Sequence, residues 1–147
     1  MKRMTPPVLF FLCIALMVGI RTQIVFQEVI PQPFNYGGIV LILIGLIITI
    51  KVRNNFSKTD TEMHTFKIPR KLVTQGFFSV SRNPVYFGFV VSLIGVWILL
   101  GTVLPLVGCL IFILVTHYWY IPYEERVMKE VFGAEYEAYK SRVRRWI

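Results

Sequence analysis

Four long apolar runs constrain this chain of 147 residues more than any other feature of its sequence. They cover about residues 7–26, 36–52, 84–100 and 103–121, and the second contains the uninterrupted string GGIVLILIGLIITI. A helix needs roughly 20 apolar residues to cross a bilayer. A chain that is 55% hydrophobic also has too little polar surface to cover a soluble domain of this size. The runs predict an all-α integral membrane protein with four transmembrane helices, forming a single membrane domain over residues 1–147.

Lysines and arginines alternate in density between the sides of these runs. They are frequent before the first run, in residues 53–83 and in residues 122–147, whereas the turn between the third and fourth runs has none. Basic residues mark the cytoplasmic side of a membrane protein. We therefore expect both termini and the loop 53–83 to be cytoplasmic, with Gly101, Thr102 and Pro105 forming a tight hairpin on the other side.

The tail, residues 122–147, is too polar to cross the membrane and has helical periodicity. Its apolar and aromatic positions are Val127, Val131, Phe132, Tyr136 and Tyr139. This spacing predicts an amphipathic helix lying on the cytoplasmic membrane face. Gly133 is expected to bend it or to divide it into two short helices.

The remaining composition argues against several other kinds of function. The net charge is +8, and the basic residues that produce it lie between apolar runs. Membrane orientation therefore explains them, and a nucleic-acid partner is not needed. Cys13 and Cys109 each lie inside an apolar run, and neither histidine, His64 or His117, is near a cysteine pair. This pattern predicts no metal site. The basic and apolar N-terminus also resembles a signal peptide, but it lacks a clear cleavage site, so we expect an uncleaved first span.

The string RNPVYFG, residues 82–88, stands where the third run begins. Asn83 suits a helix N-cap, Pro84 suits a first helical turn, and Arg82 can reach lipid phosphate. These structural roles leave Tyr86 and Gly88 unexplained. Because helix N-termini favour anions and a glycine permits close approach, the string is a candidate binding site.

Two further polar groups fall on the same predicted side. The adjacent carboxylates Glu124 and Glu125 follow the aromatic string WYIPY, and successive helical residues point about 100° apart, so the two are expected to have different roles. The chain ends in RVRRWI, and His117 lies inside the fourth run about two turns before Glu124. The three places are expected to converge on the cytoplasmic side, although helix capping and an interfacial basic patch remain alternative explanations for them.

These strings together resemble the isoprenylcysteine carboxyl methyltransferase family and the related phospholipid methyltransferases. The family pattern is LVTxGxYxxxRHPxYxG, an apolar hairpin, then a Glu-Glu pair and FGxxYxxYxxxVP. Here the matching strings are LVTQGFFSVSRNPVYFG, residues 72–88, and EERVMKEVFGAEYEAYKSRVRRWI, residues 124–147. The resemblance covers about half of the chain. The first two runs match the family only in being apolar, and they contain no family motif.

The resemblance implies methyl transfer from S-adenosylmethionine to a lipophilic acceptor. It assigns cofactor contacts to Leu72, Val73, Phe78, Asn83, Pro84, Val85, Tyr86 and Glu124. The candidate catalytic residues are Arg82, His117, Tyr120, Glu125 and Arg145. Phe78 stands where the family has a tyrosine. Three further positions depart from the family pattern: Asn83 replaces a histidine, Tyr120 replaces an arginine that contacts the substrate in eukaryotic members, and Arg144 replaces a proline.

Two other classes of function stay open from sequence alone. Membrane sterol reductases have a similar C-terminal arrangement and bind NADPH, and a helical membrane scaffold needs no cofactor. The acceptor also stays open between an isoprenylcysteine-like carboxylate or thiol and a lipid amine. The small residues Gly37, Gly38 and Gly45 permit close helix contacts within one chain or between chains, so the oligomeric state is undetermined.

Overall fold

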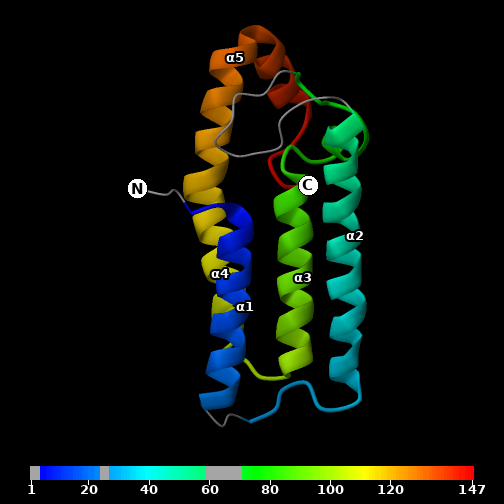
Figure 1. Ribbon diagram of the computed structural model, residues 1–147, viewed down its shortest axis with the longest axis vertical. Coiled ribbons are helices and arrows are strands. Elements are labelled where there is room, and N and C mark those ends of the chain that lie inside the picture. Colours follow the sequence, from blue (N-terminus) through cyan, green and yellow to red (C-terminus); the bar gives the residue numbers. More distant parts are fainter. Residues whose placement is uncertain (1–3, 24–26, 59–70) are drawn as a thin grey trace.

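The chain forms a bundle of helices in the computed structural model, which describes residues 4–23, 27–58 and 71–147 (Figure 1). The helices, in order, are α1 (Pro6–Gln23), η1 (Phe34–Tyr36), α2 (Gly37–Lys58), η2 (Gly76–Ser79), α3 (Pro84–Leu100), α4 (Leu106–Val115), η3 (Thr116–Tyr120) and α5 (Ile121–Arg142). Within these ranges there is no strand, and Ser81 and Arg144 form one isolated parallel bridge. The all-α prediction is therefore confirmed for the described residues.

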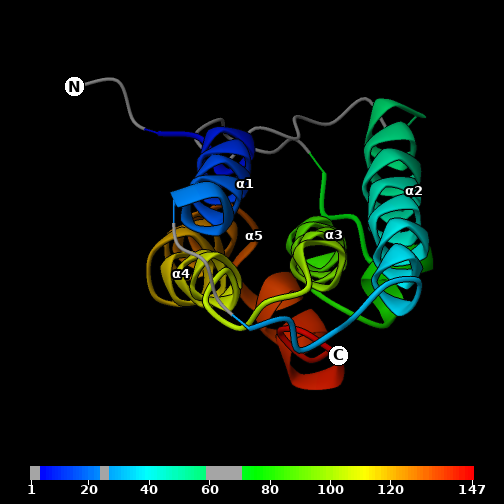
Figure 2. The ribbon, with the colours of Figure 1, turned by 90° about the horizontal axis from the view of Figure 1, so that it is seen from below.

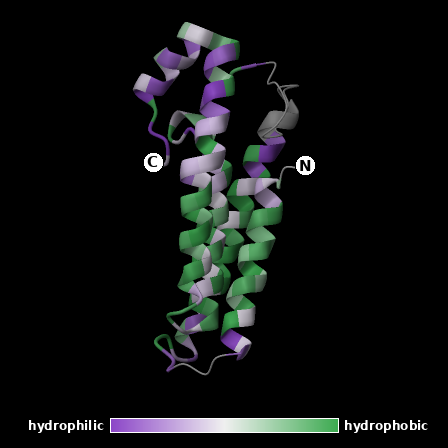
Figure 3. Cartoon of the chain, turned by 90° about the vertical axis from the view of Figure 1, so that its left-hand side faces the viewer, coloured by the Kyte–Doolittle hydropathy of each residue, from purple (hydrophilic) through white to green (hydrophobic). Residues whose placement is uncertain are grey.

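Helix α3 lies in the middle of the bundle (Figure 2). It packs against α2 on one side, and against α1 and α4 on the other, and α1 packs against α4. The apolar residues occupy the length of the bundle, and polar residues gather at its two ends (Figure 3).

The outward surfaces of the helices are apolar, as expected for contact with lipid. Large exposed hydrophobic side chains include Phe11, Leu12 and Leu16 on α1, Val40, Leu43 and Ile47 on α2, and Leu110 and Leu114 on α4. Among the described residues, three helical stretches are long and apolar enough to cross a membrane: Pro6–Gln23, Phe34–Asn54 and Leu106–Arg142. Helix α3, with 17 residues, is apolar but shorter. The chain is thus a multi-pass membrane protein, and the fourth crossing stays a prediction.

Glycines bring α2 and α3 into backbone contact. A Cβ atom at Gly45 would meet the Gly88 carbonyl and Ser92, and one at Gly95 would meet the Gly38 carbonyl and lie 2.7 Å from the Ile42 nitrogen. Small residues at membrane helix interfaces allow this approach. Gly38 and Gly45 therefore serve contacts within one chain, whereas a Cβ at Gly37 would meet nothing within 4 Å. The close approach that Gly88 permits is made by α2.

The fourth apolar run does not end at residue 121. Helix α4 continues through the π-helical turn η3 into α5 without a break. Pro122 has no N–H to donate, and its ring would clash with the carbonyl four residues before it in a regular helix. A π-turn directly before Pro122 shifts the hydrogen bonds to a longer spacing, so the proline is accommodated. No motif in the sequence predicted this turn.

Gly133 divides α5 as expected. Its backbone is non-helical, with φ 51° and ψ −120°, and the chain folds back there toward the start of α3 (Figure 1). The returning half buries Tyr136 and Tyr139, with Met128 and Phe132 packed beside them. Val131, which the periodicity placed on the apolar side, is 42% exposed. The bend at Gly133 changes which residues face inward.

The predicted segment ends also differ from the structure at the end of α2 and at the start of α4, which begins at Leu106 and not at residue 103. Helix α2 runs to Lys58, six residues beyond the predicted end at 52, so the loop begins later than residue 53. The end of the first run, residues 24–26, and loop residues 59–70 lie outside the described part of the chain. The third run matches α3 at both ends, and the predicted hairpin is present, with Gly101 at φ 72°.

Replacing Gly45 with alanine is expected to lower the free energy of unfolding by about 1–3 kcal/mol, because the new Cβ overpacks a backbone contact. The matched control is Gly19→Ala on α1, where a Cβ meets nothing within 4 Å. Thermal unfolding in detergent measures both. Equal behaviour of the two variants would contradict the close α2–α3 contact.

Candidate active site

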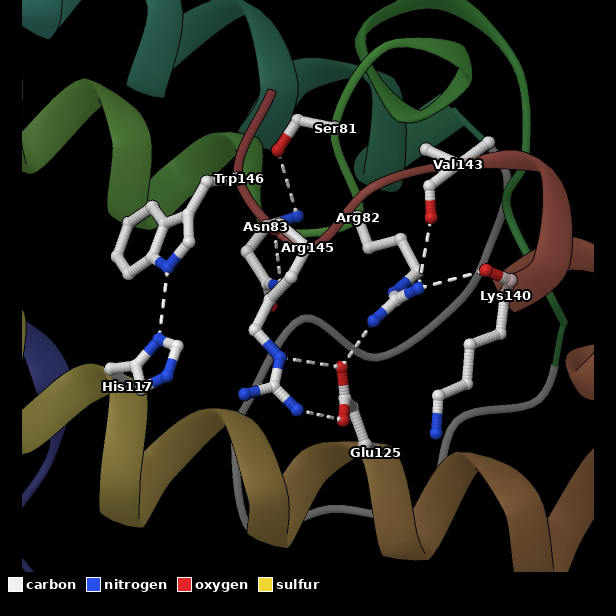
Figure 4. Close-up of polar contacts among 9 residues, drawn as sticks. All are labelled: Ser81, Arg82, Asn83, His117, Glu125, Lys140, Val143, Arg145 and Trp146. Carbon is white, nitrogen blue, oxygen red and sulfur yellow. Dashed lines mark hydrogen bonds and ion pairs between the residues drawn. The ribbon is translucent and has the colours of Figure 1, made fainter.

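Three segments far apart in the sequence meet at the end of the bundle where α3 begins (Figure 4). They are the residues entering α3, the junction of η3 and α5, and the last residues of the chain. The sequence predicted this convergence. We call residues 143–147, which run across the start of α3, the C-terminal strap.

Glu125 lies between two arginines. Its Oε1 accepts hydrogen bonds from Arg82 at 2.7 Å and from Arg145 Nε at 3.1 Å, and its Oε2 accepts another from Arg145 at 2.7 Å. The side chains of Arg82 and Glu125 are only 8% and 11% exposed. Burial raises the pKa of the Glu125 carboxyl, but the hydrogen bonds and charges of Arg145 and Arg82 outweigh burial and hold the pKa below its ordinary value. Glu125 is therefore an anion held by two cations.

Arg82 also fixes the C-terminal strap. Its NH1 donates to the carbonyls of Lys140 at 3.0 Å and Val143 at 2.8 Å, and its backbone N–H donates to the Arg144 carbonyl at 3.0 Å. The idea that Arg82 reaches lipid phosphate is therefore wrong, because its guanidinium is turned inward. Within the described part of the chain, its Nε is a buried donor with no hydrogen-bond partner.

Asn83 does not cap α3 with its side chain. Its Nδ2 donates instead to the Arg145 carbonyl at 2.9 Å, and its backbone N–H donates to Ser81 Oγ at 3.1 Å. Pro84 occupies the first turn of α3, as predicted. The asparagine therefore joins α3 to the C-terminal strap, which is a role that its position before a helix did not suggest.

Glu124 faces a different group from Glu125. Its Oε1 accepts a hydrogen bond from the Tyr86 hydroxyl at 2.8 Å. The Tyr86 and Tyr120 rings are nearly parallel, with centroids 6.4 Å apart, and the Tyr120 hydroxyl donates to the Met4 carbonyl at 2.7 Å. The two adjacent carboxylates thus have separate surroundings, as the 100° step between them requires.

His117 and Glu125 point from one helix toward the C-terminal strap (Figure 4). In a regular helix, residues eight apart differ by about 80° around the axis. The extra residue in a π-turn reduces this difference to about 20°. Trp146 Nε1 donates a hydrogen bond to His117 Nδ1 at 3.1 Å. The π-turn η3 is therefore what places His117 in the site.

The other predicted cofactor contacts lie in a second apolar cluster. Phe78 is buried there with Val52, Tyr136 and Tyr139, and Leu72, Val73 and Val85 pack against them. The Tyr139 hydroxyl donates to the Phe78 carbonyl at 2.7 Å. Burial raises the pKa of Tyr136 to about 12 and also raises that of Tyr139, so both phenols stay protonated at neutral pH. This cluster fixes the loop before α3 against the returning half of α5.

Sequence reasoning missed two contributors to the site. The sequence singled out neither Trp146, which bonds to His117, nor Ser81, which is buried beside Asn83. An indole N–H needs a partner when it is buried, which is the one signal that pointed to Trp146.

Comparison with known proteins shows the family of this chain. A family profile for phospholipid methyltransferase matches residues 34–135. A probable protein-S-isoprenylcysteine O-methyltransferase of Oryza sativa subsp. indica is 30% identical over 135 residues, covering 88% of this chain and 69% of that protein. Protein-S-isoprenylcysteine O-methyltransferase B of Arabidopsis thaliana is 30% identical over 128 residues, covering 82% and 64%. No solved structure matches the chain.

The fold and the site define a helical membrane protein with a buried polar cluster at one end of its bundle. The chain belongs to the phospholipid methyltransferase family. The family profile ends at residue 135, so it does not include the C-terminal strap.

Glu125→Gln is expected to lower the free energy of unfolding by about 3 kcal/mol, because it leaves a buried arginine without its counter-charge. The control is Glu137→Gln, which breaks the exposed pair with Lys129 and should change stability little. Denaturation in detergent compares them. If the two variants lose the same stability, the contacts of Glu125 with the two arginines do not stabilise the fold as their geometry indicates.

The stability of the folded chain should also depend on the charge of Glu125. The folded pKa lies below the ordinary value of 4.5, so the cluster stabilises the fold fully above that pH and loses this effect as pH falls through the lowered pKa. Unfolding temperature measured from about pH 7 to about pH 3 should fall more steeply in the native chain than in Glu125→Gln. Parallel curves would exclude this contribution.

Proposed function

We propose that the protein transfers a methyl group from S-adenosylmethionine to a lipophilic acceptor at the cytoplasmic face of the membrane. The observation that carries this proposal is the pairing of Tyr86 with Glu124, since the family pattern assigns both residues to the cofactor and they lie 2.8 Å apart. The curated relatives, named for methyl transfer to isoprenylcysteine, support an acceptor of that lipophilic kind.

The residues at the site fit the chemistry of this cofactor. Its amino group and sulfonium are cationic, and Glu124 supplies a carboxylate while the parallel rings of Tyr86 and Tyr120 offer aromatic faces that attract cations. Leu72, Val73, Phe78 and Val85 supply an apolar surface for a flat base. The partnerless Nε of Arg82 is a buried donor suited to an anionic oxygen.

The cofactor supplies an electrophilic methyl group on sulfur, and the residues of the chain supply alignment and a dry site. Glu124 holds the charged end, with Tyr86 fixing the orientation of its carboxylate. Arg82 and Arg145, both paired with Glu125, hold the C-terminal strap over the start of α3. Alignment and exclusion of water are the main requirements of such a displacement.

The proposed topology has four crossings, with both termini, the loop before α3 and the site on the cytoplasmic side. Basic residues flank the site end, and Tyr118 and Trp119, each 73% exposed, lie in η3 at the depth where aromatic side chains meet lipid headgroups. In this arrangement the polar cofactor enters from the cytoplasm, and the apolar acceptor enters from the bilayer between helices.

Calorimetric titration of the purified protein with S-adenosylhomocysteine tests the proposal. Glu124→Gln is expected to weaken binding about 10- to 100-fold, because it removes a charge-assisted contact. Glu130→Gln, an exposed position on the same helix, is the control and should bind normally.

Two other outcomes point to other functions. Binding of NADPH without binding of S-adenosylhomocysteine would replace the proposal with a membrane reductase. A folded protein that binds neither ligand would indicate a membrane scaffold.

A further inference from the structure

The His117–Trp146 contact has a geometry that specifies where the histidine carries its proton. The two ring planes lie within 8° of each other, and their centroids are 6.4 Å apart. The 3.1 Å contact between these nearly parallel rings is a hydrogen bond from the indole N–H to Nδ1. An indole nitrogen only donates, and Nδ1 must therefore present a lone pair.

We propose that Trp146 is a positioning residue that selects one tautomer of the neutral His117 ring, the one with its proton on Nε2. In this form His117 meets the methyl acceptor as a hydrogen-bond donor and not as a general base. The nitrogen that is able to take up a proton is already the acceptor of the indole hydrogen bond.

The position of Trp146 is itself determined by the residues that enter α3. Arg82 binds the carbonyls of residues 140, 143 and 144, and Asn83 binds the carbonyl of Arg145, directly before Trp146. The π-turn η3 turns His117 toward the same place. Arg82 and Asn83 thus orient His117 indirectly. They bind the C-terminal strap, and Trp146 of the strap binds His117.

What the His117 tautomer implies for the methyl acceptor rests on the proposed function. In the transfer, a lone pair of the acceptor forms the bond to the methyl carbon, and the electron pair of the broken methyl–sulfur bond stays on sulfur. A carboxylate or thiolate needs no proton removed, whereas a lipid ammonium must first lose one to a base.

The other candidate catalytic residues do not supply that base. The guanidinium groups of Arg82 and Arg145 have donors and no acceptor. They lower the pKa of Glu125, and the Tyr120 hydroxyl donates to the Met4 carbonyl. The arrangement therefore favours an acceptor that arrives already deprotonated.

Nitrogen NMR of the histidine side chains tests the proton position directly. The chain has two histidines, and His64→Asn leaves His117 as the single labelled imidazole. We expect an unprotonated Nδ1 and a protonated Nε2 at a pH where the ring is neutral. Trp146→Phe removes the donor and should give a mixture of the two neutral forms, whereas Trp119→Phe, at a position 73% exposed, should change nothing.

A protonated Nδ1 in the native chain would overturn the proposal, and so would an unchanged spectrum in Trp146→Phe. Should the variant fail to fold, the native spectrum still decides. This readout does not depend on methyl transfer, so failure of the proposed function is recognised separately, by loss of S-adenosylhomocysteine binding in the native protein.

A kinetic experiment compares two methyl acceptors, a carboxylate that carries a prenyl thioether and a lipid amine. Trp146→Phe should lower turnover of the first about 10-fold, by loss of one oriented hydrogen bond, while affinity for S-adenosylhomocysteine stays unchanged. Efficient methylation of the amine, unaffected by the variant, would contradict the role assigned to His117.

Discussion

The ion cluster of Arg82, Glu125 and the half-buried Arg145 is the interaction on which the site end of the molecule depends. Isolated surface ion pairs contribute little to stability, but removing one member of a buried group leaves another charge without compensation. Here one guanidinium binds both the carboxylate of α5 and the carbonyls of the returning chain. Loss of Arg82 would therefore release α5 and the C-terminal strap together, and a lysine would not replace it, because a single ammonium lacks the planar fork of donors.

The backbone contact between α2 and α3 holds the start of α3, and with it this cluster, in place. Gly45 and Gly88 face each other only two residues beyond Tyr86, so the first turns of α3 have little freedom to move. A rigid start to α3 holds Tyr86 against Glu124 and keeps Asn83 in reach of the strap. In a membrane, where lipid competes with apolar packing, close backbone contact of this kind is a principal means of holding two helices together.

Much of this arrangement was predictable from sequence, because the membrane imposes a simple pattern. Apolar runs and basic flanks predicted the helices, and the strings at residues 82–88 and 124–147 predicted which segments converge. The π-turn was not predictable. A proline usually marks a helix boundary, but here the helix continues from α4 through Pro122 into α5. The inward turn of Arg82 and the side-chain contact of Asn83 were missed for a similar reason, because each depends on a strap more than 55 residues away.

The π-turn also explains how one helix serves two environments. The apolar part, α4, packs against α1 through buried Cys109 and Phe112, whose positions are set by the core of the bundle. The polar part, α5, must present Glu124 to Tyr86 and Glu125 to the arginines. A regular helix joins these two faces at a fixed angle, and the additional residue in η3 corrects that angle. The site therefore depends on a local departure from regular helix, which lies directly before Pro122 and between the apolar α4 and the polar α5.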